Sequence, residues 1–277
     1  AITHTATYSH IYHVGITNPA TDAPTIGFRR MLDISTGLTQ GIGDDGAGNP
    51  VNPASANPVV SYDGKYTAFQ SRANNLCAAD GNPAATSTIT HVYRNHIDSP
   101  PATGWNILAS KNGSTFGNGN STLPTINTNG TKVAFQSVAT NFGLGDADAL
   151  SDIYLYNFGT SALSWVSQNP GSGAKGSSTK PSFDNAGKYI VFLSDTIGLV
   201  SSVTDAVVRP YVKDTTAVSN TYTLIGGASG QIPSAACDNP TMAGAGNHVV
   251  FDTSSKNLTT DTYAGATTLN VFIRKWQ

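Results

Sequence analysis

The chain has 277 residues, of which 12% are charged, and its 15 Lys and Arg against 17 Asp and Glu give a net charge of −2. A strongly basic surface marks proteins that bind nucleic acid or anionic membranes, so this charge balance excludes both classes of partner. No apolar run approaches the about 18 residues that a membrane span needs. The hydrophobic content of 39% is that of a folded chain and not of a disordered one.

The first 56 residues contain two short segments with strand-like alternation, HIYHVGI at 10–16 and RRMLDIS at 29–35. The chain begins at Ala1 without a basic or apolar leader, as a mature protein does after its signal peptide has been removed. We therefore expect a secreted or cell-surface location. The Gly-, Pro- and Asn-rich stretch at 44–58 is expected to be a linker.

An internal repeat occupies the rest of the chain, with Pro followed by Gly six positions later and by Phe eleven positions later. The four copies lie at 57–71, 123–137, 180–194 and 239–253. Pro opens a short strand, Gly makes a tight turn that needs a positive φ, and an alternating strand follows. Third strands are expected at 91–97, 152–158, 209–214 and 270–276, and fourth strands at 106–110, 163–167 and 222–226.

Each repeat is thus predicted to be a four-stranded antiparallel meander. One such sheet cannot bury both of its faces alone, so the copies must stack around an axis, which predicts an all-β chain of the β-propeller class. We expect a single domain over 1–277 with four to five four-stranded blades. Since the last repeat stops after its third strand, the ring is either incomplete or closed by the N-terminal region, with RRMLDIS as the outer strand of the terminal blade.

The repeat can be compared with a known family. Its pattern is P-x-x-x-x-x-G-x-x-x-x-F-x-S, followed by an Asn-Leu loop such as Asn75-Leu76 or Asn257-Leu258 and then by D-[IV]-[YF]-[VL]. Over residues 57–277 this pattern resembles the TolB-like propeller repeat of exported bacterial proteins. The repeats are spaced by 57 to 66 residues, whereas a blade usually takes about 40 to 50. The surplus is expected in long loops between second and third strands, where a binding function would be carried.

Two cysteines, Cys77 and Cys237, lie 160 residues apart in loop-like surroundings. In an exported protein this pattern favours one long-range disulfide, and the alternative is two free buried thiols. No Cys or His cluster with zinc spacing accompanies them.

The loop GDADALSD places Asp146, Asp148 and Asp152 at a spacing similar to that of calcium ligands. It lacks the Gly and the bidentate Glu of an EF-hand loop. Turn formation by the Asp side chains explains the same residues without an ion, so both interpretations stay open.

Four of the six histidines are candidate metal ligands: His10, His13, His91 and His96. Within a strand, residues an odd number apart point to opposite faces, so neither pair in one strand can chelate. Across neighbouring blades, His13 could meet His91, or His10 could meet His96, and two imidazoles suit copper or zinc. The set resembles the surface copper-binding proteins of methane-oxidising bacteria, although their Trp-x-His element has no match here. The alternative is ordinary hydrogen bonding by strand histidines.

The sequence contains no GxSxG, HExxH or P-loop motif, and the first strands of the repeats carry Asn127 and Asp184 but no His, Glu or Arg. We therefore expect an exported, non-enzymatic, cell-surface binding protein, with copper as the best ligand and calcium as a second cofactor. One alternative is a propeller scaffold that binds protein or glycan through its long loops without metal. Another is a polysaccharide-active enzyme.

Overall fold

The structure is a computed structural model that describes residues 55–72, 76–77, 88–96, 106–169, 175–217, 219–227, 230–259 and 269–277 in full. Of the N-terminal region it describes the backbone of β1 (Tyr12–Ile16), β2 (Phe28–Asp33), β3 (Gly43–Asp44) and β4 (Pro50–Val51). All regular elements of these residues are strands. Within them no helix is long and apolar enough to cross a membrane.

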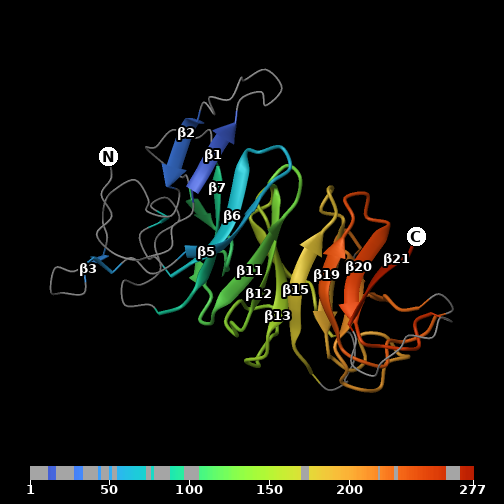
Figure 1. Cartoon of the computed structure of the whole chain (residues 1–277). Coiled ribbons are helices and arrows are strands. Elements are labelled where there is room, and N and C mark those ends of the chain that lie inside the picture. Colours follow the sequence, from blue (N-terminus) through green and yellow to red (C-terminus); the bar gives the residue numbers. More distant parts are fainter. Residues whose placement is uncertain are drawn as a thin grey trace.

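Four antiparallel meanders follow one another along the chain, and we call them blades 1 to 4. Blade 1 holds β5 (Ser55–Val60), β6 (Tyr66–Ser71), β7 (His91–His96) and β8 (Asn106–Leu108), and blade 2 holds β11 (Ser121–Ile126), β12 (Lys132–Ser137), β13 (Asp152–Asn157) and β14 (Ala162–Trp165). Blade 3 holds β15 (Ser178–Phe183), β16 (Tyr189–Ser194), β17 (Arg209–Asp214) and β18 (Thr223–Leu224), and blade 4 holds β19 (Cys237–Met242), β20 (His248–Thr253) and β21 (Asn270–Lys275). A small hairpin of β9 (Lys111–Asn112) and β10 (Thr115–Phe116) separates blades 1 and 2. The blades lie side by side in chain order (Figure 1), which confirms the all-β propeller architecture.

The repeated Pro lies at a β-bulge in the first strand of every blade. The pairing register shifts across Ala56/Val59, Thr122/Thr125, Thr179/Ser182 and Asp238/Thr241. The residue before each Pro has a φ between 48° and 53°. Pro has no N–H for the ladder, so it is tolerated where the pairing is interrupted.

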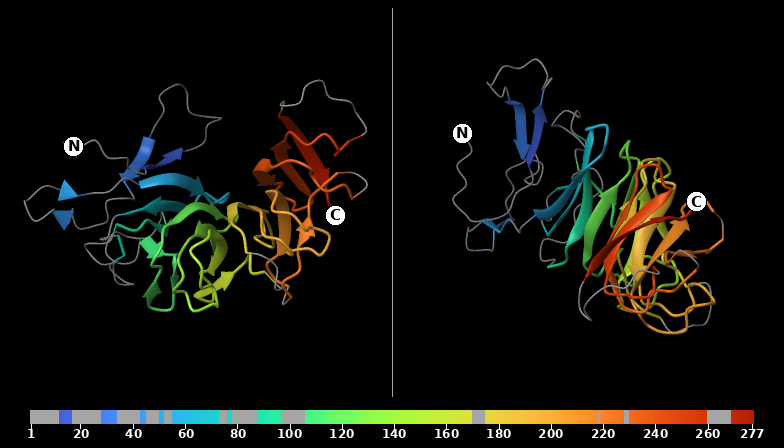
Figure 2. Two further views of the ribbon diagram at one scale, coloured as in Figure 1. Left: turned by 90° about the horizontal axis from the view of Figure 1, so that it is seen from below. Right: turned by 45° about the vertical axis from the view of Figure 1, so that its right-hand side comes forward.

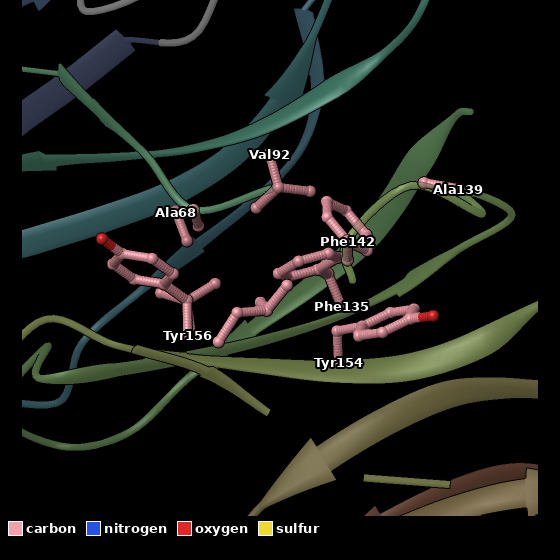
Figure 3. Close-up of a cluster of buried hydrophobic side chains, with 10 residues drawn as sticks. Ala68, Val92, Phe135, Ala139, Phe142, Tyr154 and Tyr156 are labelled. Carbon is pink, nitrogen blue, oxygen red and sulfur yellow. The ribbon is translucent and has the colours of Figure 1, made fainter. Parts of the chain in front are cut away.

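The repeated Phe supplies the core between blades. Phe135 and Tyr154 of blade 2 pack against Ala68 and Val92 of blade 1 (Figure 3). The next two junctions are built in the same way, with Phe192 and Tyr211 against Ala134 and Ile153, and Phe251 against Val191 and Val212. Each blade therefore presents an aromatic face to the preceding blade and an aliphatic face to the following one.

Backbone hydrogen bonds tie the tight turns of successive blades together. The N–H groups of Asp63, Thr128 and Asn185 donate to the carbonyls of Thr128, Asn185 and Gly244 at 3.1, 3.0 and 2.9 Å. The repeated Gly occupies these turns with φ values between 64° and 73°. Because non-Gly residues rarely adopt such values, the spacing of Gly after Pro is explained by the turn itself.

The predicted closure of the ring by the N-terminal strands is wrong for the described residues. RRMLDIS supplies β2, which pairs with β1, while β21 pairs with β20. The β1–β2 hairpin and blade 4 lie at opposite ends of an open arc (Figure 2). Pairing within a hairpin closes a much shorter loop than pairing across the whole chain, and its entropic cost is lower. The described arc is incomplete, and a single domain over 1–277 stays a prediction.

Candidate functional site

The loop between β12 and β13 brings three carboxylates together. One oxygen from each of Asp146, Asp148 and Asp152 lies within 4.8 Å of the other two. No other group of three or more His, Cys, Asp or Glu ligands is found in the described part of the chain. The same side chains also form turns, since Asp146 Oδ1 accepts from the Asp148 N–H at 3.2 Å and Asp148 Oδ1 accepts from the Leu150 N–H at 3.0 Å. The Asp side chains therefore form the turns that the sequence suggested, and the same geometry is compatible with a cation.

Two of the carboxylates, Asp148 and Asp152, line a pocket of about 360 Å³ at the junction of blades 2 and 3, and Asp146 lies buried behind them. Its walls come from four separate segments of the chain, and all but one of its side-chain-bearing residues are polar or charged. They are Asp148, Asp152, Trp165, Ser167, Gln168, Asn169, Lys175 and Thr196, with Gly145 and Gly176 completing the wall. We call it the Asp pocket.

Asp152 is the most constrained of the three acids. Its side chain is 5% exposed, and Oδ1 accepts hydrogen bonds from Trp165 Nε1 at 2.8 Å and from Ser167 Oγ at 2.6 Å. No described residue donates a hydrogen bond to its Oδ2. Burial raises the pKa of Asp152 to about 6; the hydrogen bonds oppose this rise, and the charges of Asp146 and Asp148 add to it.

The other two acids have different partners. Asp146 is buried, and its Oδ2 accepts a hydrogen bond of 2.5 Å from Tyr154 Oη. Asp148 is half-buried and forms an ion pair of 2.8 Å with the exposed Lys175. Burial favours the neutral acid at Asp148, but the hydrogen bond and charge of Lys175 outweigh it and hold its pKa below the ordinary value. Two acids and one lysine thus line the pocket, with the third acid, Asp146, directly behind them.

The three acids could be identified from the sequence, but the residues that surround them could not. GDADALSD is a local pattern, whereas Trp165 and Ser167 reach Asp152 from the neighbouring strand and Lys175 comes from the linker to blade 3. A tryptophan on an outer strand, such as Trp165, is from the sequence alone most simply interpreted as packing between blades. Only the pairing of β13 with β14 brings its ring nitrogen to a carboxylate.

Of the four candidate copper ligands, the structure describes the side chains of His91 and His96 only, and these two lie on opposite faces of β7. His91 is 2% exposed, its Nδ1 lies 3.2 Å from Ser110 Oγ, and burial lowers its pKa to about 4. His96 lies on the opposite face of β7 and packs against the ring of Tyr66 at 4.5 Å. His10 lies outside the described residues, as does the side chain of His13 in β1. Copper bound by His13 with His91, or by His10 with His96, stays a prediction.

The predicted disulfide is wrong, because Cys77 and Cys237 are both free and buried. Cys77 packs in the core of blade 1 beside Phe69 and Tyr93, whereas Cys237 lies in the core between blades 3 and 4. The two thiols belong to separate clusters and act there as small apolar side chains. Burial raises the pKa of the Cys237 thiol to about 11, so it carries no thiolate at neutral pH.

No family model and no curated protein matches this chain. Among solved structures it is similar to a putative TolB from Agrobacterium tumefaciens, with 15% identity over 89% of this chain and 62% of that one and a TM-score of 0.45. It is also similar to TolB from Acinetobacter baumannii, with 14% identity over 96% of this chain and 50% of that one and a TM-score of 0.47. The chain thus spans 62% and 50% of the lengths of these two structures. The β-propeller fold rests on the four meanders of the chain itself, and these distant likenesses agree with it without adding a function.

The prediction that the chain is not an enzyme is corrected by the same comparisons. Similar structures include a puromycin-hydrolyzing peptidase of Mycobacterium tuberculosis, at 13% identity over 74% of this chain and 29% of that one, with a TM-score of 0.44. They also include a gluconolactonase of Xanthomonas campestris, at 15% identity over 74% of this chain and 55% of that one, with a TM-score of 0.39. The lack of a familiar motif in the sequence does not by itself exclude catalysis. These distant likenesses assign no activity to this chain.

Proposed function

We propose that this chain is a binding protein whose site is the Asp pocket and whose ligand is calcium. The observation that carries the proposal is the convergence of three carboxylate oxygens within 4.8 Å of one another, at the wall of a pocket that contains one lysine. Ionised carboxylates this close repel one another by on the order of 3 kcal/mol per pair at an effective dielectric of about 20. A divalent cation removes that repulsion, whereas the single ammonium of Lys175 offsets only part of it.

The chemistry of the walls favours calcium over softer metals. The described lining contains oxygen ligands and no His or Cys, and hard cations prefer oxygen. Calcium accepts about six to eight oxygens in irregular geometry, while magnesium demands a near-octahedral set. The carboxylates would supply the charge, the hydroxyls and amides of Ser167, Thr196 and Asn169 are further oxygen sources, and water would complete the shell.

Lys175 has a defined role in this proposal. Its ammonium lies 2.8 Å from Asp148 Oδ2, its side chain is 53% exposed, and its segment joins blade 2 to blade 3. Because the side chain is long and solvated, it can leave the carboxylate at little cost when a cation arrives. Lys175 therefore competes with the cation for Asp148 and lowers its affinity.

Binding is tested by calorimetric titration of chelator-treated protein with calcium chloride. We expect one saturable equivalent, lost in Asp148→Asn and Asp152→Asn and strengthened in Lys175→Gln. Asp214→Asn is the matched control, since this carboxylate lies on β17 outside the pocket and should leave binding unchanged. A titration without saturable heat, or equal binding by Asp152→Asn and wild type, would contradict the proposal.

Export fits this proposal, because extracellular modules bind calcium with dissociation constants of about 10⁻⁴ to 10⁻³ M. A site in which a lysine must be displaced is expected in that weak range. Protein or glycan ligands held through the long loops would then share the rim of the Asp pocket, where Gln168 and Asn169 add amide groups.

A further inference from the structure

Blade 4 ends the arc with an apolar sheet face that no described blade covers. Leu269, Val271 and Ile273 are 66%, 76% and 71% exposed, three of the six large hydrophobic side chains that are exposed in the described residues. In β21 the alternate side chains point inward, and Phe272 packs on Phe251 with ring centroids 5.9 Å apart. The exposed row is therefore the aliphatic face of blade 4.

The same face is buried in every other blade. Val92, Ile153 and Pro210 are the counterparts of Val271, and all three are buried beneath the aromatic face of the next blade. Arg94, Leu155 and Val212 are the counterparts of Ile273 and are at most 9% exposed. The face of blade 4 thus has the composition of an interblade interface, but no described blade packs on it.

A second copy cannot cover this face by continuing the propeller stack through its described blades. The aromatic faces of the four blades are already filled, since Phe69, Phe135, Phe192 and Phe251 are at most 1% exposed. The one blade face of a second copy that remains uncovered among the described residues is its own blade 4. Two copies can therefore bury these side chains only by packing blade 4 on blade 4.

The charges on the face are arranged for such self-packing. Cross-strand pairs share a face, and here they form three rows: His248 with Lys275, Val250 with Ile273, and Asp252 with Val271. One end of the face carries Lys275, the middle is apolar, and the other end carries Asp252. A two-fold axis through the middle row sets Lys275 of each copy over Asp252 of the other.

Asp252 provides a second observation. Its Oδ2 accepts a hydrogen bond of 2.7 Å from Asn239, but its Oδ1 is buried without a hydrogen-bond partner. A buried carboxylate oxygen without a donor is unfavourable. Because Oδ1 is shielded from the surface, an ammonium from a facing sheet would contact Oδ2 and offset the charge of this poorly satisfied carboxylate.

We propose that this chain forms a symmetric dimer in which the aliphatic faces of two copies of blade 4 pack together as a two-layered sheet. Val250 and Ile273 form the centre of the contact, Val271 and Leu269 extend its apolar part at the Asp252 end, and Lys275 and Asp252 form reciprocal ion pairs. Sheets that pack face to face lie about 10 Å apart, a spacing that side chains of this size fill. This inference is independent of calcium binding.

The test is the mass in solution, measured by light scattering during gel filtration of the full chain. We expect a species of twice the 28.7 kDa chain that dissociates in Val271→Thr/Ile273→Thr. Lys275→Asp and Asp252→Lys should each give monomers, and the double exchange Asp252→Lys/Lys275→Asp should restore the dimer. Val60→Thr is the matched control, since Val60 is 57% exposed at the opposite end of the arc.

The thermal midpoint of each variant is measured alongside, so that unfolding is not mistaken for dissociation. If the wild type is a monomer at all concentrations, the proposal is wrong, and the apolar face of blade 4 would then be a contact surface for a different protein. A dimer that persists in Val271→Thr/Ile273→Thr would also overturn it, because the contact would then use another surface. If the double charge exchange stays monomeric while both single variants are folded, the proposed two-fold register is wrong.

Discussion

Trp165 Nε1 and Ser167 Oγ donate hydrogen bonds to the same oxygen of Asp152, Oδ1, at 2.8 and 2.6 Å. Both donors lie on the side of the fourth strand, so the second oxygen of this carboxylate is left for another partner. The arrangement couples an indole directly to the pocket. A cation bound by the Asp152 carboxylate must therefore change the environment of Trp165.

The first prediction uses this coupling. Calcium should change the tryptophan fluorescence of the wild type along a saturable curve, because the electric field at the Trp165 ring changes when Asp152 gains a cation. Trp165→Phe should lose the fluorescence response and keep calorimetric binding. A response that survives in Trp165→Phe would place the event at another tryptophan.

The second prediction concerns the buried charge of Asp152. Its pKa of about 6 in the folded state lies above the ordinary value of 3.8, so ionisation opposes folding. In chelator, the stability of wild type relative to Asp152→Asn should therefore fall as pH rises from 4 to 6. Asp152→Asn, which can still accept both hydrogen bonds, should be more stable than wild type at pH 7 by ~1–3 kcal/mol in denaturant unfolding.

The same variant separates stability from binding. Calcium should raise the thermal midpoint of wild type at pH 7 and leave that of Asp152→Asn unchanged. If Asp152→Asn is less stable than wild type in chelator, the carboxylate of Asp152 stabilises the fold by itself, and its negative charge does not need a bound cation to offset it.

The third prediction concerns His91, whose pKa is lowered by burial to about 4 from an ordinary value of 6.5. Its neutral form stabilises the fold above pH 6.5, and this contribution is lost as pH falls towards 4. The unfolding free energy of wild type relative to that of His91→Gln should fall by ~2–3 kcal/mol when the pH is lowered from 7 to 4. Parallel pH profiles would contradict the burial of this imidazole.

The fourth prediction compares two glycines at equivalent turns. A Cβ on Gly130 would lie 2.2 Å from Cδ2 of Tyr66, whereas a Cβ on Gly64 would have nothing within 4 Å. Both have positive φ, of 67° and 71°, so the backbone strain is matched. Gly64→Ala should destabilise by about 1 kcal/mol and Gly130→Ala by a further ~1–3 kcal/mol. Equal losses in thermal unfolding would mean that the turn of blade 2 does not pack on Tyr66.

The fifth prediction concerns the cysteines. Thiol titration of unreduced protein in denaturant should detect two thiols per chain, and folded protein should react slowly because Cys77 and Cys237 are buried. If no thiol is detected in the denatured protein, Cys77 and Cys237 are joined in a disulfide and their assignment as free thiols is wrong.

What could be predicted from the sequence depends on how local each feature is. Pro58, Gly64 and Phe69 each do their work within one hairpin, as a bulge, a turn and a core residue, so a repeated pattern was enough to predict the blades. Ring closure and the pairing of Cys77 with Cys237 depend on where distant segments lie. A repeat gives no such information: of the two arrangements left open for the ring, the described residues form the incomplete one, and the predicted disulfide was wrong.

The candidate site follows the same division. The three acids of GDADALSD lie within seven residues, and their clustering could be read from the chain. Trp165 and Lys175 join them only through strand pairing and the path of a linker. The exposed face of β21 has the same alternation as the buried faces of β7 and β13, so sequence alone could not distinguish it.

The central claim is that the Asp pocket holds calcium, and anomalous diffraction from a crystal grown in calcium tests it most directly. The account predicts one peak in the pocket, about 2.3–2.6 Å from oxygens of Asp146, Asp148 and Asp152, with Lys175 moved away from Asp148. A pocket without a peak at saturating calcium, with Lys175 still paired to Asp148, would contradict it.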